Sequence, residues 1–280
     1  MTFHYNRPLE VKCDEFIMRL FFSGTLRAVA VYPLNTRTKA SDISFSRNAP
    51  GKMSNVRPAP GPDGRRGTSY EFKGGKNSYI QFPNLGKLDT RKSITILAWI
   101  YHQGRAGPIF NYHPSAWGVH FWVVGRRALF VRFTKRRTKD FTAALVSKTV
   151  KRSRWQYVGA SYDHATGTAK LFVGGRMVAK RRIGRIRLAT NYPVRMGVRE
   201  GDGRYFRGRI SCLQVYDVAL NTRQIAARAK RCFVPGRLCP CYSRVRLVFI
   251  CIQPIYAGCL LLLILWLWFK GTQSAGAQAH

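Results

Sequence analysis

Acidic residues are scarce in this sequence. Its 280 residues include 12 Asp and Glu against 48 Lys and Arg, which gives a formal net charge of +36. Calcium sites and glycosidase active sites both need clustered carboxylates, so this scarcity disfavours both classes of site. The excess of positive charge instead predicts attraction to anionic partners, such as nucleic acid, acidic membrane surfaces and sulfated or carboxylated glycans.

Several motifs that carry chemistry are missing as well. The six histidines show no H-E-x-x-H or other metal spacing, and neither G-x-S-x-G nor a phosphate-binding P-loop occurs. No zinc-finger spacing, basic region with heptads or aromatic RNA-binding signature is present, so no specific nucleic-acid partner is predicted. The sequence therefore predicts no enzyme, no cofactor and no metal. It also has no N-x-[ST] acceptor, so glycosylation gives no support for secretion.

One long uncharged run stands near the C-terminus. Residues 247–269 form a stretch of 23 residues without a charged side chain. A helix of that length spans roughly 34 Å, enough to cross the hydrocarbon core of a bilayer. We therefore expect one transmembrane helix at 247–269, preceded by a basic juxtamembrane linker at 233–246 and followed by a short tail at 270–280. A buried core helix is the alternative.

The charges around this run conflict over its orientation. Basic residues crowd its N-terminal side between Arg228 and Arg246, whereas only Lys270 follows it. The positive-inside rule then favours a tail-anchored protein with a cytoplasmic N-terminal part. That rule weakens when a whole domain precedes the span. We expect a single-pass membrane protein with an extracellular domain, and the cytoplasmic orientation stays open.

The first 67 residues carry a weaker pattern. Residues 16–32 are apolar, but Arg19 and Arg27 interrupt them, and acidic residues precede them where a cleavable signal peptide carries positive charge. A strand and a degenerate signal are both compatible with this stretch. Residues 33–67 are rich in Pro, Gly, Asn and Ser, so we expect 1–67 to be an N-terminal segment with a loop-rich linker.

Residues 68–232 read as one β domain. Short runs rich in β-branched and aromatic residues recur between turn sequences such as KGGKN, DHATG and VGGR. No long helical pattern separates the runs. The pattern predicts an all-β fold, namely a two-sheet antiparallel jelly-roll sandwich with a short C-terminal helix.

Alternation along these runs assigns side chains to faces. In WGVHFWVV (117–124) the odd-numbered residues, Trp117 included, should face the core, while His120 and Trp122 should lie on the outer face. The same alternation puts Arg132 on the outer face of the following run. Such a face can stack on a sugar or hold an anion. The alternatives are that its aromatics pack under neighbouring loops or that the two faces are reversed.

A basic cluster overlaps these runs in GRRALFVRFTKRRTK, at 125–139. The candidate ligand-binding residues are the outer-face side chains together with this cluster. They are His120, Trp122, Arg126, Arg127, Arg132, Lys135, Arg136 and Arg137. Guanidinium groups beside aromatics favour sulfated or acidic polysaccharides, by charge first and shape second.

The end of the domain combines a strand, a helix and two cysteines. ISCLQVYDV looks like the final strand, and Asn221 with Gln224 has the spacing of a capping box for a helix from about Thr222 to about Arg231. Cys212 and Cys232 can then join that helix to the strand. Closing a loop of this length with a disulfide would stabilise the domain by about 3 kcal/mol. A free buried pair of thiols is the alternative.

Four segments in order resemble a known family. SYEFKGGKNSYIQFP, LDTRKSITILAWIY, WQYVGASYDHATGTAKLFVGGRMV and FRGRISCLQVYDVALNTRQIAA are similar to the laminin-G-like, or pentraxin-like, jelly roll of the concanavalin-A-like lectin/glucanase superfamily. The resemblance covers roughly residues 68–232. It implies a two-sheet sandwich that serves as an extracellular binding or adhesion module, without fixing the ligand.

The carboxylates used by some members of that family are largely absent. Glycosidase relatives carry two or three carboxylates on one strand, whereas only Glu200 and Asp202 approach that spacing here, in a glycine-rich turn. Calcium-binding relatives would use such residues together with Asp163, but arginines flank both places. We therefore expect neither hydrolysis nor a calcium site.

The function expected from the sequence is a membrane-anchored module that recognises anionic glycans or matrix proteins. The alternative is a structural scaffold for protein–protein adhesion or self-association, with no glycan ligand and with oligomers at the cell surface. In that case the charge would serve only to keep the domain soluble.

Overall fold

The computed structural model of the protein describes residues 26–233. No helix between residues 26 and 233 is both long enough and apolar enough to cross a membrane. The run 247–269 lies outside the described residues, as do the segment before residue 26 and most of the predicted juxtamembrane linker. The transmembrane helix therefore stays a prediction.

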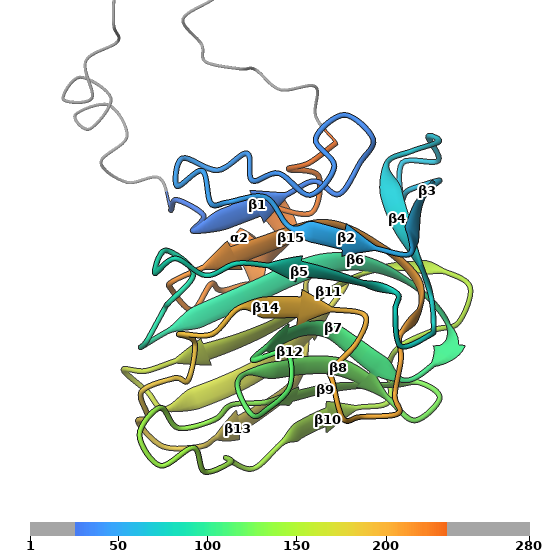
Figure 1. The fold of residues 1–280 in the computed structure, drawn as a ribbon. Coiled ribbons are helices and arrows are strands. Elements are labelled where there is room, and N and C mark those ends of the chain that lie inside the picture. Colours follow the sequence, from blue (N-terminus) through green and yellow to red (C-terminus); the bar gives the residue numbers. More distant parts are fainter. Residues whose placement is uncertain (1–25, 234–280) are drawn as a thin grey trace, which may run out of the picture. The chain divides into compact units, whose positions relative to one another are not determined.

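Two antiparallel sheets form the described unit (Figure 1). The first has eight strands in the order β13-β12-β11-β6-β15-β4-β3, and β1 pairs with the part of β15 that β4 leaves free. Its strands are β1 (Ala30–Tyr32), β3 (Val56–Ala59), β4 (Ser69–Lys73), β6 (Ile94–Arg105), β11 (Trp155–Asp163), β12 (Thr168–Val173), β13 (Arg176–Arg182) and β15 (Arg207–Tyr216).

The second sheet has seven strands in the order β10-β9-β8-β7-β14-β5-β2. Its strands are β2 (Lys52–Ser54), β5 (Tyr79–Phe82), β7 (Gly107–Tyr112), β8 (His120–Val124), β9 (Ala128–Arg132), β10 (Leu145–Ser147) and β14 (Val194–Met196). Neighbours such as β14 and β5 are more than a hundred residues apart in the chain, which is expected of a jelly-roll sandwich.

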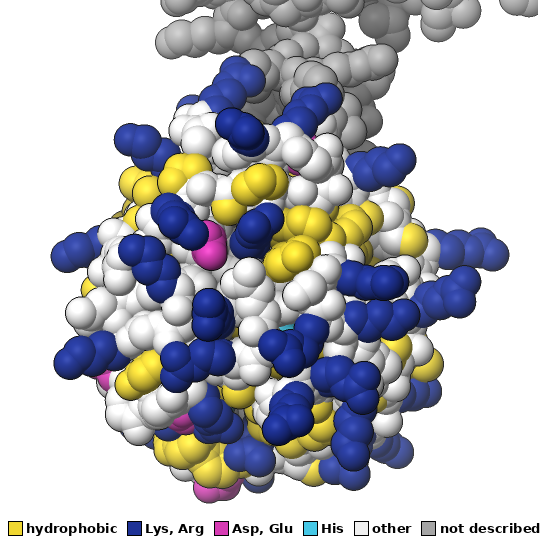
Figure 2. Space-filling model, turned by 90° about the vertical axis from the view of Figure 1, so that its right-hand side faces the viewer, with side chains coloured by type: hydrophobic (Ala, Val, Ile, Leu, Met, Phe, Trp, Pro, Cys, Tyr) yellow, Lys and Arg dark blue, Asp and Glu magenta, His cyan; other side chains and the backbone are white. Residues whose placement is uncertain are grey.

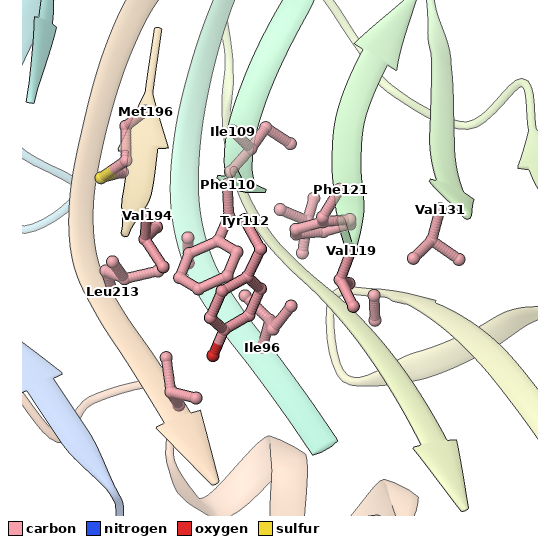
Figure 3. Close-up of a cluster of buried hydrophobic side chains, with 14 of the residues drawn as sticks. Ile96, Ile109, Phe110, Tyr112, Val119, Phe121, Val131, Val194, Met196 and Leu213 are labelled. Atoms are coloured by element: carbon pink, nitrogen blue, oxygen red, sulfur yellow. The ribbon is translucent and has the colours of Figure 1, made fainter. Parts of the chain in front are cut away.

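The core lies between the two sheets (Figure 3). Ile96 and Leu213 approach it from the eight-stranded sheet, and Phe121, Val131 and Met196 approach it from the seven-stranded sheet. All five side chains are fully buried. Burying large apolar side chains of this kind contributes about 1.5–3 kcal/mol each relative to leaving them in water. The predicted all-β two-sheet sandwich is confirmed.

Alternation was correct from Val119 to Val123 and wrong at Trp117. Val119, Phe121 and Val123 are buried in the core, as predicted, with His120 and Trp122 on the opposite face. Trp117, predicted to be a core residue, is instead 40% exposed. The strand begins only at His120, and the residues before it form a turn that follows the left-handed backbone of His113. The period of two therefore does not extend to Trp117.

The sandwich also takes in residues from the segment before residue 68. β1 lies in 16–32, where a strand was one of two open interpretations, and it pairs with β15. β2 and β3 lie in the predicted linker, and they pair with β5 and β4 respectively. Each is only three or four residues long, and β3 contains a proline. Such short edge segments show too little alternation to stand out against their turn-rich surroundings.

The strand–helix junction at the end of the domain is as predicted, but the helix is shorter. Helix α2 (Thr222–Ala227) starts with the expected reciprocal capping box between Asn221 and Gln224. After Ala227 the bonds of the backbone change to the i→i−3 type, so the chain continues as tight turns and not as α-helix. The disulfide Cys212–Cys232 is present, with the two Cα atoms 5.6 Å apart.

Candidate functional site

A polar row crosses the outer face of the seven-stranded sheet. The pairing registers place its members side by side on five adjacent strands of that sheet. In order they are Arg132 (β9), His120 (β8), Asn111 (β7), Arg195 (β14) and Gln81 (β5). Arg195 donates from Nε to Gln81 Oε1 over 2.8 Å. Three of these side chains, His120, Asn111 and Arg195, are buried, so other parts of the protein cover most of this row.

Aromatic rings lie along the same face. The imidazole of His120 stacks between Trp117 and Trp122, with ring centroids 5.2 Å and 5.5 Å away. Trp122 donates its indole N–H to Asn111 Oδ1 over 3.0 Å, which fixes the ring in the sheet. His120 and Trp122 are almost completely buried. The face therefore has a rigid aromatic floor, because each ring is held by a neighbour or a hydrogen bond.

Two arginines from a distant loop cover these rings. The guanidinium carbon of Arg199 lies 4.6 Å from the centroid of Trp117, and that of Arg204 lies 4.7 Å from the centroid of Trp122. Asp202 holds both arginines, because it accepts from Arg204 Nη2 at 2.6 Å and from Arg199 Nη2 at 3.3 Å. Cation–π contact and ion pairing together fix the two guanidinium groups above the aromatic floor.

These side chains enclose a cavity of about 140 Å³ on the outer face of the sheet. We call it the sheet-face cavity and define it by its lining residues. They are Trp117, His120, Trp122, Phe130, Arg132, Arg199 and Arg204. The volume is below the 300 Å³ or more of a typical site for a whole small molecule, so it suits one substituent of a larger ligand.

The charge of the sheet-face cavity is positive. His120 does not add to it, because burial, reinforced by the nearby Arg199 and Arg132, lowers the pKa of its imidazole to about 3. The neutral ring accepts a hydrogen bond from the Gly118 amide at Nε2. Three arginines line the cavity, and one aspartate outside the lining pairs with two of them. The site therefore carries a net positive charge at neutral pH that does not depend on His120.

Two nitrogen atoms in this lining have no partner. Within residues 26–233, the buried Nε atoms of Arg132 and Arg199 make no hydrogen bond. A buried donor left unpaired costs about 1–3 kcal/mol. An oxyanion placed in the cavity can accept from the guanidinium groups that line it, and it would balance their charge.

The candidate residues predicted from the sequence fall into three places. His120, Trp122 and Arg132 lie on the outer face, as the alternation predicted, and they line the sheet-face cavity. His120 and Trp122 are only 4% and 2% exposed, so the alternative that the aromatics of this face pack under a neighbouring loop also holds. Arg126 and Arg127 are exposed at the turn between β8 and β9. The remaining three line a different hollow, described below, and they are Lys135, Arg136 and Arg137. Arg199 and Arg204 were missed, although the alternation of charges in REGDGR, with one aspartate between two arginines, is a visible signal.

The two carboxylates of this loop are both engaged by arginines. Glu200 accepts from Arg195 Nη1 at 2.6 Å, and Asp202 is paired as described above. The hydrogen bonds from Arg204 lower the pKa of Asp202 to about 2. Asp163 accepts from Thr166 and from the amide of Ala165, as a turn residue does. In the part of the chain that the structure describes, no group of three His, Cys, Asp or Glu could hold a metal ion.

The variant D202N should separate the role of this carboxylate from that of its neighbours. Because the pKa of Asp202 is depressed from 3.8, its stabilisation is present above about pH 4 and is lost as the pH falls towards 2. We expect D202N to lower the free energy of unfolding by roughly 1–2 kcal/mol at pH 7 and by much less at pH 2. Urea unfolding at both pH values measures this.

The matched control is E200Q. Glu200 lies in the same loop and pairs with one arginine, but its side chain is 55% exposed, so its loss should cost under about 1 kcal/mol at either pH. Because the pKa of His120 is lowered from 6.5 to about 3 in the folded state, the free energy of unfolding of every variant also falls as the pH is lowered through that range. Equal destabilisation by D202N and E200Q at pH 7 would mean that Asp202 does not hold the two arginines.

The fold defines a class: an antiparallel two-sheet jelly-roll sandwich. A family model of the laminin G type, described as the concanavalin A-like lectin/glucanases superfamily, matches residues 73–226. The chain belongs to this superfamily, which also includes glucanases. A search of curated proteins returned no match.

Solved structures share the fold at low sequence identity. The binding domain of Paraclostridial Mosquitocidal Protein 1 is 13% identical with a TM-score of 0.59, over 72% of this chain and 51% of that one. The ligand-binding domain of botulinum neurotoxin serotype D, in complex with N-acetylneuraminic acid, is 12% identical with a TM-score of 0.57, over 72% and 50%. This chain thus spans about half of the toxin binding domains.

A third structure matches over nearly its whole length. Domain 4 of AbnA, an extracellular GH43 arabinanase from Geobacillus stearothermophilus, was solved in complex with arabinotriose. It is 15% identical with a TM-score of 0.56, over 73% of this chain and 98% of that domain. At these identities the likeness concerns the fold alone.

Proposed function

We propose that this protein is a glycan-binding module whose sheet-face cavity takes an anionic substituent of a saccharide. The observation that carries the proposal is the convergence of Arg132, Arg199 and Arg204 on one cavity. A carboxylate or sulfate group of the sugar would accept from these guanidinium groups. Phe130 and Phe141 supply apolar walls beside Arg132, against which a sugar ring can pack.

Two neighbours in fold support the choice of ligand class. One of the toxin domains was solved with N-acetylneuraminic acid, a sugar with a carboxylate, and the arabinanase domain was solved with arabinotriose. Basic side chains also spread over the face of the protein seen in Figure 2, where few acidic ones accompany them. Such a surface raises the local concentration of polyanionic glycans and the rate of encounter.

Retention on heparin, together with binding of 3′-sialyllactose, tests this function in the full-length protein. We expect retention beyond about 0.3 M salt, because several charge pairs have to be screened before release. We also expect saturable binding of the sialylated trisaccharide and much weaker binding of neutral lactose. Equal binding of lactose and sialyllactose, or elution below that salt concentration, would contradict the proposal.

A scaffold for protein–protein adhesion is the second candidate function. The observation in its favour is that Ile43, Phe45 and Leu85 are 54%, 65% and 84% exposed on loops of the described unit. Exposed apolar side chains of this size favour contact with another protein surface. This function predicts concentration-dependent oligomers that Phe45→Ser dissolves, and no glycan binding.

We further propose that the domain is displayed outside the cell, on a span formed by residues 247–269. The disulfide Cys212–Cys232 supports this orientation, because disulfides persist in oxidising compartments. The basic residues before the span favour the opposite orientation. Protease treatment of intact cells separates the two, since an extracellular domain is digested and a cytoplasmic one is protected.

A further inference from the structure

A second hollow, outside the sheet-face cavity, has a volume of about 530 Å³. It lies between the loop that follows β9 and the loop that precedes β14. We call it the basic groove and define it by the residues that line it. They are Lys135, Arg136, Arg137, Thr138, Arg185, Ile186 and Arg187. Its size is within the range of small-ligand sites, unlike that of the sheet-face cavity.

The walls of the basic groove are held in place by backbone and ion-pair contacts. The amide of Arg136 donates to the carbonyl of Arg187 over 2.8 Å, which ties the two loops together. The guanidinium of Arg136 makes a bidentate pair with Asp89, at 2.8 Å and 2.9 Å. The amide of Ile186 donates to the hydroxyl of Tyr162. The groove is therefore preorganised and need not be ordered by a ligand.

Most of the positive charge in the groove is not balanced. Arg136 is neutralised by Asp89, and Lys135 has only the exposed Asp140, at 3.7 Å. Among residues 26–233, the side chains of Arg137 and Arg187 make no ion pair or hydrogen bond, and Arg185 donates from Nε to the Ala165 carbonyl. Like charges gathered at short range repel one another, and a bound anion removes that cost.

We propose that the basic groove binds a sulfate group of a linear sulfated glycan, as a second anion site separate from the sheet-face cavity. The inference rests on the proposed glycan-binding function and extends it to the class of saccharide. Guanidinium groups present paired N–H donors that match a tetrahedral oxyanion, and Arg137, Arg185 and Arg187 supply three of them.

One loop connects the two sites. The loop after β9 carries Lys135 to Thr138 into the basic groove, and it carries Phe141 to the sheet-face cavity. There Phe141 packs edge-on against Trp117, with the ring centroids 4.4 Å apart. The same loop therefore lines the basic groove and contacts a residue that lines the sheet-face cavity. Two linked contacts raise the overall affinity above that of either site.

The test compares two heparin-derived tetrasaccharides of equal length, one fully sulfated and one desulfated and N-acetylated, on the full-length protein. We expect R185Q/R187Q to weaken binding of the sulfated tetrasaccharide about tenfold at 0.15 M salt, since two charge-assisted contacts are removed. The desulfated tetrasaccharide keeps its carboxylates for the sheet-face cavity, so its affinity should change less than twofold. Isothermal titration calorimetry measures both.

The matched control is R65Q/R66Q. Both arginines are exposed in the turn between β3 and β4, at the far edge of the eight-stranded sheet from β13, and the change removes the same charge. It should weaken binding of the sulfated tetrasaccharide by less than twofold. If R185Q/R187Q lowers the melting temperature by more than a few degrees, R137Q/R187Q replaces it.

The outcomes distinguish a failure of the proposal for the basic groove from a failure of the proposed glycan-binding function. Failure of the wild-type protein to bind either tetrasaccharide overturns the proposed function. The groove proposal alone is overturned if the wild-type protein binds both tetrasaccharides and R185Q/R187Q leaves that binding unchanged. It is also overturned if R65Q/R66Q weakens binding of the sulfated tetrasaccharide as much as R185Q/R187Q does. A single-stranded oligonucleotide that binds more tightly than the sulfated tetrasaccharide, and loses affinity in R185Q/R187Q, would show that the groove takes phosphate diesters and would overturn the sulfated glycan as its ligand.

Discussion

The double variant W117A/R132Q should bind 3′-sialyllactose about 100-fold more weakly than the wild-type protein does. Arg132 has no acidic partner among residues 26–233, so its replacement removes a cation from the cavity without leaving a carboxylate unpaired. Trp117 supports the guanidinium of Arg199 from below, at 4.6 Å, and is 40% exposed. Its loss should loosen Arg199, which then keeps only its ion pair with Asp202 at 3.3 Å. Calorimetry on the full-length variants measures the change.

The matched control for this variant is Y101A/R209Q. Arg209 lies 5.0 Å from the ring centroid of Tyr101, so this is also an aromatic–arginine pair, but both residues belong to the eight-stranded sheet. Its removal should leave the affinity for sialyllactose within about twofold of wild type, because it takes away only distant, screened charge. Equal losses in the two variants would mean that general charge attracts the saccharide and that the sheet-face cavity does not.

Removal of the disulfide should have the largest effect on stability. We expect C212A/C232A to lower the free energy of unfolding by about 3 kcal/mol, because the closed loop of about 20 residues restricts the unfolded chain. In the native state the segment after α2 keeps other anchors. Trp99 donates its indole N–H to the Ala229 carbonyl, and Gln214 donates to the Arg228 carbonyl. The fold should therefore persist, and urea unfolding should shift to a lower midpoint. The slope should be at least as steep as that of the wild type, because the unfolded chain is less compact without the cross-link.

Two comparisons check the mechanism of this effect. A reducing agent should destabilise the wild-type protein to the level of C212A/C232A and should leave the variant unchanged. Binding of sialyllactose should be the same with and without the disulfide, because Cys212 lies on the eight-stranded sheet and the cavity lies on the other. A variant as stable as wild type, or one that loses binding, would contradict this account of the strand–helix junction.

The sequence predicted those parts of the fold whose signals are local. Alternation in β8 and β9 placed His120, Trp122 and Arg132 on the outer face, because a period of two holds wherever a strand is regular. The capping box at Asn221 and Gln224 was equally local, and it located the start of α2. Trp117 was predicted wrongly because the alternation was extended back beyond His120, the first residue of β8, into residues that do not belong to the strand.

The parts of the candidate site that could not be predicted from the sequence depend on contacts between segments that are distant in the chain. Arg199 and Arg204 reach Trp117 and Trp122 because β14 lies beside β7 in the sheet, which brings the loop after β14 next to β8. No local pattern near Trp122 encodes that order. In the same way, the basic cluster at 125–139 looks continuous in sequence. It is divided in space because β9 ends at Arg132 and the chain then turns back through Lys139, whose backbone is left-handed.

The indole N–H signals of the protein labelled with ¹⁵N-tryptophan test the central claim most directly. Trp117 and Trp122 line the sheet-face cavity, whereas Trp99 and Trp155 belong to the eight-stranded sheet and serve as internal controls. On addition of 3′-sialyllactose to the full-length protein we expect the signals of Trp117 and Trp122 to move and saturate together, while those of Trp99 and Trp155 stay in place. Saturable binding that moves Trp99 or Trp155 and leaves Trp122 unmoved would contradict an anion site on the outer face of the seven-stranded sheet.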